Sequence, residues 1–294
     1  MASPCEVAIG AHLPHAARSL ADMAIAEVHR IESKYSRFTT DSVVAGINER
    51  AAREYVEVDD ETRSLLDYAG RIHRLSGGRF DITTGLLQQA WDFRKGTIAE
   101  PSRLLELRQH VGWAHVQLTD HGIRFHRPQM QLDFGGFGKE YAADRAADVL
   151  RQHGVQSGYV NLGGDVAAIG VRPDGEPWSM GVQHPRQAGE LLASIPLADA
   201  SLATSGDYER FFERDGRRYC HILSPLTGEP VNHWQSVSVV APRAITAGAT
   251  CTVAMLLEAD GLDFLRDAGL PFLAVDAAGE VFTHQPHRRK AGAS

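Results

Sequence analysis

Apolar residues recur along the chain with two periods, and each period predicts a different element. Near the N-terminus they recur every three or four residues, which predicts an amphipathic helix over residues 16–36. The stripe consists of Leu20, Met23, Ala24, Val28 and Ile31. A short apolar strand over residues 5–10 precedes this helix. A second helix over residues 60–75 follows, and it ends before Gly77 because glycine commonly terminates helices.

The middle of the chain switches to short alternating runs separated by turn sequences, which predict antiparallel strands. These strands cover residues 79–83, 113–118, 123–126 and 130–134. A helix over residues 139–153 follows and ends at Gly154.

The second half predicts further strands over residues 159–162, 165–170, 178–183, 192–196, 217–223 and 235–240. Helices over residues 247–258 and 261–267 and a hairpin over residues 272–275 and 280–283 follow. Strands and helices mix without strict strand–helix–strand alternation. The predicted fold class is therefore α+β, with a mixed, largely antiparallel sheet and flanking helices.

Length and composition bound the organisation of the 294 residues. A hydrophobic fraction of 43% and a charged fraction of 23% are typical of a globular protein. No Pro/Gly/Ser-rich linker divides the chain, so we expect one domain over residues 1–284 and a basic, polar, disordered tail over residues 285–294. No run of about 18 apolar residues predicts a membrane span, and no signal-peptide pattern opens the sequence, so we expect a cytoplasmic protein.

Net charge and cysteine content argue against further classes of protein, namely non-specific nucleic-acid binders and proteins held together by disulfides or zinc. The net charge of −7 argues against non-specific binding to nucleic acid. Cys5, Cys220 and Cys251 are odd in number and widely spaced, with no Cys-x-x-Cys pair. We interpret them as reduced structural thiols, not as disulfides or zinc ligands.

The segment D-F-G-G-F-G-K-E-Y-A-A-D, residues 133–144, carries the clearest chemistry. Glycines at 135, 136 and 138 allow backbone N–H groups to approach an anion, and Lys139 lies where a helix begins. The alternative is a tight turn with a surface lysine, and both readings stay open. A Walker A loop is excluded because Asp133 and Glu140 stand where it needs Gly and Ser or Thr, and a Rossmann fingerprint is excluded because Tyr141 stands at its third glycine.

Two further segments carry reactive groups. His221 lies where a predicted strand runs into a Pro/Thr/Gly turn, so it is either a general base or a hydrogen-bonded structural histidine. Cys220 points to the opposite strand face, which excludes a Cys-His dyad. Residues 245–252 open a helix with several hydroxyl groups, which either cap the helix or approach a metal ion. A hard metal there needs an acid from elsewhere, and the candidates are Asp165, Asp199 and Asp207.

The order of these motifs resembles the ApbE-type FAD:protein FMN transferases over nearly the whole chain. The matching segments are Y-S-R-F-T-T-D-S, G-G-R-F-D-I-T-T-G-L-L, W-D-F, D-F-G-G-F-G-K-E-Y-A-A-D, N-L-G-G-D, A-T-S-G-D-Y, H-I-L-S-P-L-T-G and T-A-G-A-T-C-T. The most specific of these are D-F-G-G-F-G-K-E-Y-A-A-D, whose glycines and lysine would form an anion cradle, and the pair formed by T-S-G-D-Y and H-I-x-x-P-x-T-G.

The resemblance implies a magnesium-dependent enzyme that splits FAD, attaches FMN through a phosphoester to a Thr or Ser of an acceptor protein, and releases AMP. It implies His221 and Lys139 as catalytic residues, and Gly138, through its carbonyl, and Thr252 as metal ligands. The residues that it implies for flavin nucleotide binding are Tyr35, Trp91, Asp92, Phe93, Asp133, Gly136, Lys139 and Leu223.

The chain departs from the family pattern at three positions. Gly248 stands where many members have an acidic metal ligand, and Ser224 replaces the acid of H-I-x-D-P. Glu140 stands where the family often has Gly. These departures leave two alternatives beside the transferase, namely a hydrolase that splits FAD to FMN and AMP and a catalytically silent FAD-binding protein.

Overall fold

The computed structural model describes residues 4–10 and 14–285. Within them, a seven-stranded sheet has the order β1-β4-β5-β8-β11-β12-β13, and every neighbouring pair is antiparallel. Its strands are β1 (Cys5–Ile9), β4 (Gly158–Leu162), β5 (Asp165–Ile169), β8 (Ser201–Gly206), β11 (Trp234–Ala241), β12 (Phe272–Asp276) and β13 (Val281–His284). The predicted α+β class with a largely antiparallel sheet is confirmed.

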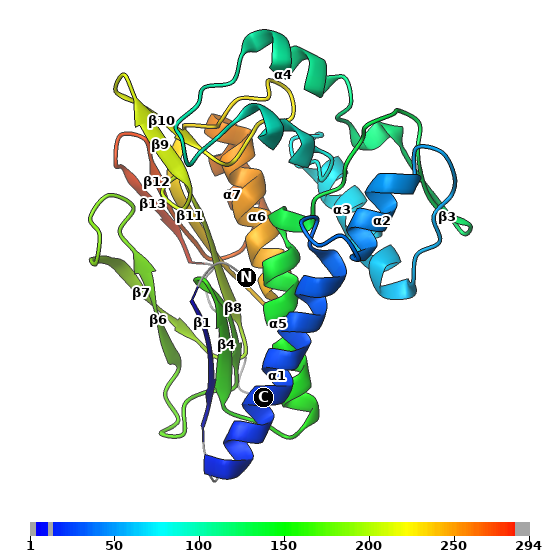
Figure 1. Ribbon diagram of the computed structural model, residues 1–294. Coiled ribbons are helices and arrows are strands. Elements are labelled where there is room, and N and C mark those ends of the chain that lie inside the picture. Colours follow the sequence, from blue (N-terminus) through cyan, green and yellow to red (C-terminus); the bar gives the residue numbers. More distant parts are fainter. Residues whose placement is uncertain (1–3, 11–13, 286–294) are drawn as a thin grey trace.

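Helices cover one face of this sheet (Figure 1). They are α1 (Pro14–Tyr35), α5 (Gly138–Gln152), α6 (Ala244–Leu257) and α7 (Gly261–Ala268). Helix α5 packs between α1 and α6 through four alanines that are fully buried, Ala142, Ala143, Ala146 and Ala147. Because alanine adds only a methyl group, the α5 backbone lies close to both neighbours, which brings the beginning of α5 against α6.

The opposite face of the sheet is covered by a hairpin of β6 (Trp178–Gln183) and β7 (Leu191–Leu197) (Figure 1). Met180, Val182 and Leu197 of the hairpin pack against Val166 and Leu202 of the sheet. The sheet is therefore buried on both faces, which explains why β5 and β11 are almost continuously buried.

The remaining elements lie between residues 43 and 136, around residues 211–220 and at residues 258–260. They are α2 (Val43–Arg50), α3 (Asp60–Leu75), η1 (Thr84–Ala90), α4 (Pro101–Arg108), η2 (Trp113–His115), β2 (Val116–Thr119), β3 (Gly122–Phe125), η3 (Phe134–Gly136), β9 (Phe211–Arg214), β10 (Arg217–Cys220) and η4 (Glu258–Asp260). The helices α2 and α4 and the strands β8 and β9 were not predicted from the sequence.

Two predicted strands are wrong. Residues 79–83 form turns, because Asp81 Oδ1 accepts hydrogen bonds from the backbone and hydroxyl of Thr83. Residues 130–134 are extended in part but pair with no strand, since the side-chain amide of Asn48 binds both the N–H and the carbonyl of Leu132 at 2.7 and 3.0 Å. A single side chain thus replaces the neighbouring strand.

The predicted terminal tail, residues 285–294, lies outside the described residues apart from residue 285. The single-domain reading of residues 1–284 stays a prediction. Within the described residues, the segment Ala244–Ala268 is long and apolar enough to cross a membrane by composition, yet 56% of its apolar 18-residue window is buried inside the protein. We assign it to the core, because α6 packs against β8, β11 and α5.

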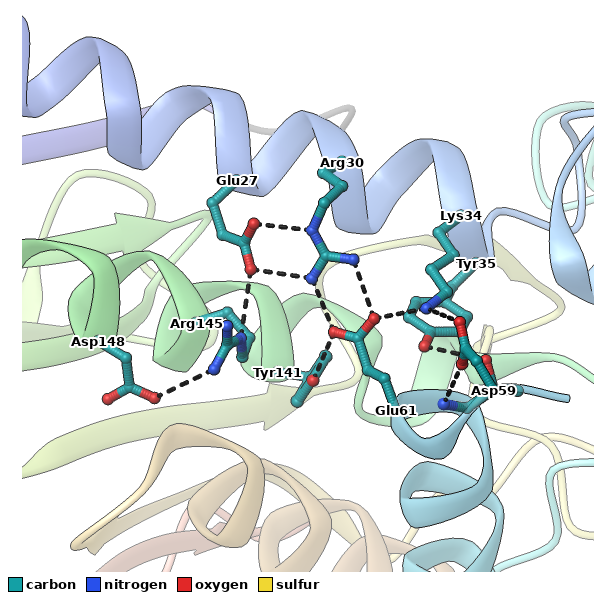
Figure 2. A network of polar contacts seen from close by, with 10 residues as sticks. Glu27, Arg30, Lys34, Tyr35, Asp59, Glu61, Tyr141, Arg145 and Asp148 are labelled. Carbon is teal, nitrogen blue, oxygen red and sulfur yellow. Dashed lines mark hydrogen bonds and ion pairs between the residues drawn. The ribbon is translucent and has the colours of Figure 1, made fainter. Parts of the chain in front are cut away.

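A network of charged side chains joins α1, α3 and α5 (Figure 2). Glu61 of α3 accepts hydrogen bonds from Arg30 and Lys34 of α1 and from the Tyr141 hydroxyl of α5, at 2.6–2.9 Å. The hydrogen bond from Arg30 is the main reason that the pKa of Glu61 lies well below its ordinary value. Tyr141 belongs to the first turn of α5, so this network fixes the helix end that carries Lys139 and Glu140.

Helix α6 begins three residues earlier than predicted because its cap comes from another helix. The carboxylate of Asp144 in α5 accepts hydrogen bonds from the N–H groups of Ala244 and Ile245 at 2.8 and 3.0 Å. The hydroxyls that were candidates for this cap are not used, and Thr250 donates to the Thr246 carbonyl instead. Asp144 is 2% exposed, and burial raises its pKa.

We expect Asp144→Ala to lower the free energy of unfolding by about 1–3 kcal/mol, because two N–H groups at the start of α6 lose their acceptor. Denaturant unfolding of the purified variant measures this loss. Asp144→Asn, which keeps one acceptor oxygen, should lose less. Equal stability of Asp144→Ala and the wild type would show that water replaces the cap.

Candidate functional site

Lys139 of α5 is held by a buried carboxylate. Its Nζ lies 2.5 Å from Asp165 Oδ2, at the start of β5, and the Asp165 side chain is 2% exposed. The two groups form a close ion pair, and, against the effect of burial, the charge of Asp165 favours the protonated form of Lys139 and raises its pKa. The cation at the beginning of α5 is therefore already compensated by an anion, and its position does not by itself demand a phosphate.

Glu140, the next residue, places a second carboxylate in the same region. It is 7% exposed, and its Oε2 has no hydrogen-bond partner among the described residues. Burial, together with the negative charge of Asp165, raises the pKa of Glu140 well above its ordinary value. Two buried carboxylates and one lysine form an acidic cluster with one positive charge.

Helix α6 faces this cluster with Gly248 and Thr252, which lie one turn apart on the same side of the helix. Thr252 Oγ1 lies 3.2 Å from Ser205 Oγ of β8. The preceding residue of β8, Thr204, donates its N–H to Asp165 Oδ1 at 3.2 Å. The predicted metal ligand Thr252 and the predicted catalytic Lys139 thus come to one place, where α5, α6, β5 and β8 meet.

His221 follows the last residue of β10 and is partly buried, and its Nδ1 is buried without a hydrogen-bond partner among the described residues. Burial lowers its pKa to about 4, and the positive charges of Arg210 and Lys139 add to the shift. The imidazole is therefore neutral near pH 7. Cys220 points into the core, with its Sγ 3.3 Å from the Val231 carbonyl, and burial raises its pKa to about 11. The exclusion of a Cys-His dyad is confirmed.

The predicted aromatic residues form a second group. Trp91 stacks on Phe93 at 6.1 Å and lies 5.9 Å from Tyr219, and its Nε1 donates to the Gly228 carbonyl at 2.9 Å. Leu223 belongs to the same apolar cluster and lies two residues after His221. Asp92 caps the adjacent turn by accepting from the N–H groups at 94 and 95.

Asp133 and Tyr35 occupy structural positions beside the glycine segment. Asp133 accepts a hydrogen bond from Gly135 N at 2.8 Å and pairs with Arg37 Nε at 3.1 Å. Tyr35 is 5% exposed, and its hydroxyl lies 3.2 Å from Thr62 Oγ1. Their roles toward a flavin stay predictions.

None of the three glycines of the segment has a positive φ, so a left-handed backbone does not explain their presence. A Cβ on Gly136 would lie 3.0 Å from the Phe80 ring. A Cβ on Gly138, which opens α5, would meet nothing closer than 3.6 Å. The role of the Gly138 carbonyl as a metal ligand stays a prediction.

Two open depressions lie elsewhere. One of about 320 Å³ is lined by Arg37, Phe38, Ala45, Asn48, Glu49 and Gln131. The other, of about 420 Å³, is lined by Ser64, Asp67, Arg71 and Arg74. Neither lining includes Lys139, His221 or Thr252. We place the site at the charged cluster, because buried groups with shifted pKa values mark functional sites more directly than an open surface does.

Of the three acids that the sequence offered as metal ligands, the structure selects Asp165. Asp207 pairs with Arg186 and Arg218, and Asp199 lies away on the surface, where it accepts a hydrogen bond from Gly170 N.

Sequence reasoning missed Ser205, Arg37 and the aromatic partners Phe212 and Tyr219. Their only sequence signal is membership of the matching motifs or proximity to them.

The donor set suits a hard divalent cation. Within the described residues no three His, Cys, Asp or Glu side chains converge as a ready metal site. The cluster nevertheless offers the Glu140 carboxylate, whose Oε2 has no hydrogen-bond partner among the described residues, the Asp165 carboxylate paired with Lys139, and the hydroxyls of Thr252 and Ser205. Oxygen ligands of this kind, completed by water and substrate phosphates, are those that Mg²⁺ uses.

Comparison with known proteins identifies the family of this chain. A model of the ApbE family matches residues 1–274. The chain is 33% identical over 236 residues to the FAD:protein FMN transferase of Treponema pallidum, a match that covers 74% of this chain and 65%, just under two thirds, of that relative.

Solved structures agree. The ApbE protein of Thermotoga maritima superposes with a TM-score of 0.85 at 33% identity, covering 92% of this chain and 90% of that one. The flavinyl transferase ApbE of Pseudomonas stutzeri, in its apo form, superposes with a TM-score of 0.86 at 28% identity, covering 100% and 95%. The chain therefore belongs to the ApbE family of FAD:protein FMN transferases.

Proposed function

We propose that this protein transfers FMN from FAD to a Thr or Ser hydroxyl of an acceptor protein, forms a phosphoester and releases AMP in a Mg²⁺-dependent reaction. The observation that carries the proposal is the meeting of Lys139, Glu140, Asp165 and Thr252 beside a neutral, partly buried His221. These are the groups that phosphoryl-type transfer needs, namely a cation for phosphate, acidic metal ligands and a base.

The chemistry follows from the positions of these groups. The neutral imidazole of His221 accepts the proton of the acceptor hydroxyl. The acceptor oxygen then forms a bond to the FMN-side phosphorus while the bond between that phosphorus and the bridging oxygen breaks, and AMP leaves with that oxygen. Lys139 offsets negative charge on the reacting phosphates. When bound, Mg²⁺ would supply further neutralisation of the pyrophosphate, with Glu140, Asp165 and Thr252 as its protein ligands.

The aromatic cluster supports flavin binding. Phe93, Phe212 and Tyr219 are only partly buried, whereas Trp91 and Leu223 beneath them are 7% exposed. Partly exposed aromatic rings on a packed base offer stacking surface to a planar ligand. Because Leu223 lies two residues from His221, a flavin held here has its phosphates within the region of the charged cluster.

The test mixes purified protein with FAD, Mg²⁺ and an acceptor domain that carries a flavinylation threonine, and follows acceptor mass and AMP. We expect an FMN-sized gain in mass with equimolar AMP. AMP and FMN without the gain in mass would indicate the hydrolase. Neither product, despite bound FAD, would indicate the silent binding protein and overturn the proposal.

A further inference from the structure

Helices α5 and α6 meet at Glu140 and Gly248, and only one of these two positions has room for a side chain. A Cβ built on Gly248 would lie 2.5 Å from Glu140 Oε1 and 2.6 Å from its Cγ. Such distances are far shorter than a van der Waals contact. The Glu140 side chain therefore fills the space into which a residue at 248 would project.

The carboxylate that fills this space has unused bonding capacity. Only 7% of Glu140 is exposed to solvent, and its Oε2 has no hydrogen-bond partner among the described residues. A buried polar atom in this state costs free energy unless a ligand satisfies it. Asp165 lies nearby and is already paired with Lys139, so a negative charge on Glu140 would be stabilised by a further cation.

Hydroxyl donors complete the surroundings of this carboxylate. Thr252 lies one turn beyond Gly248 on α6, and its Oγ1 is 3.2 Å from Ser205 Oγ. We propose that Glu140 supplies from α5 the carboxylate ligand of the divalent cation, in the place that a side chain at 248 on α6 would otherwise take. This inference rests on the proposed function, since the cation is the one that serves FMN transfer.

The first test is a binding measurement that does not depend on turnover. Mn²⁺ alone is titrated into the purified protein, without and with FAD, and free Mn²⁺ is followed by electron paramagnetic resonance. We expect Glu140→Gln, which keeps the shape and removes the charge, to weaken Mn²⁺ binding by at least about tenfold. The matched control is Asp144→Asn, a buried acid one turn along the same helix that caps α6, and it should leave Mn²⁺ affinity unchanged.

The second test moves the carboxylate between the helices. Glu140→Gly combined with Gly248→Asp should regain Mn²⁺ affinity to within about threefold of the wild type, because a carboxylate again reaches the same space. Gly248→Asp alone should lower thermal stability without tightening Mn²⁺ binding, since Glu140 still occupies that space. Circular dichroism establishes that each variant is folded.

The outcomes separate this inference from the proposed function. If folded Glu140→Gln binds Mn²⁺ as tightly as the wild type, or if the wild type binds no Mn²⁺ with or without FAD, the proposed role of Glu140 is wrong. FMN transfer is tested separately, by the assay of acceptor mass and AMP. Glu140-dependent Mn²⁺ binding in a protein that makes neither AMP nor flavinylated acceptor would support the role of Glu140 and contradict the transferase.

Discussion

His221→Ala should lower the rate of FMN transfer by about 10²–10⁴-fold and leave FAD affinity near that of the wild type. The reason is that a general base contributes a factor of this size, while the imidazole makes no hydrogen bond through Nδ1 that the fold depends on. Single-turnover flavinylation of an acceptor domain measures the rate, and flavin fluorescence measures the affinity.

His221→Gln is the control for a structural role. Glutamine offers hydrogen bonds but cannot accept a proton, so it should be as slow as alanine. Recovery of transfer in this variant would identify His221 as a structural residue. The pH profile gives an independent readout, since the pKa of His221 is lowered to about 4 by burial. The rate should therefore show no acidic limb near the ordinary histidine value of 6.5, and an inflection there would contradict this environment.

Lys139→Met should weaken FAD binding by at least about tenfold and lower the free energy of unfolding by about 1–3 kcal/mol. The loss of binding follows from the loss of a cation beside the phosphates. The loss of stability follows because Asp165, which is 2% exposed, is left without its ion-pair partner. The range is reduced from that of a fully buried pair because the Lys139 side chain is 33% exposed. Calorimetric titration and denaturant unfolding measure the two effects.

The double variant Lys139→Met with Asp165→Asn separates these effects. Removing both charges should restore most of the stability, as replacement of a whole ion pair generally does, without restoring FAD affinity. FAD affinity that is unchanged in Lys139→Met would show that the lysine serves only to neutralise Asp165, and the cradle reading of residues 133–144 would be wrong.

The sequence predicted those helices and strands whose capping residues or pairing partners lie close in the chain, and those with a long periodic pattern of apolar residues. The helix over residues 60–75 was predicted with its observed bounds, because Asp59 caps it locally and the following turn ends it. The errors lie where a distant group decides the backbone. Asn48 replaces a strand for Leu132, and Asp144 starts α6 from another helix. No local propensity contains such information.

The site was predictable to a similar degree. Glycines next to a lysine indicated the start of α5, and Pro/Thr/Gly after His221 indicated a strand end. The choice of Asp165 over Asp199 and Asp207 depends on the pairing of β5 with β8, which places Val166 opposite Leu202. The opposition of Glu140 and Gly248 depends on how α5 packs on α6. Both depend on tertiary contacts between residues that lie far apart in the sequence.

The edge strand β1 has a consequence for how the protein is made. Cys5 pairs with Leu162 and Ile9 with Gly158, and α1 packs along α5. During synthesis the first strand and the first helix leave the ribosome long before their partners exist. The apolar stripe of α1 must stay unburied until α5 and β4 emerge, which favours chaperone binding to the nascent chain. N-terminal fragments that stop before Gly138 should therefore fail to fold alone, although they contain α1 and α3 in full.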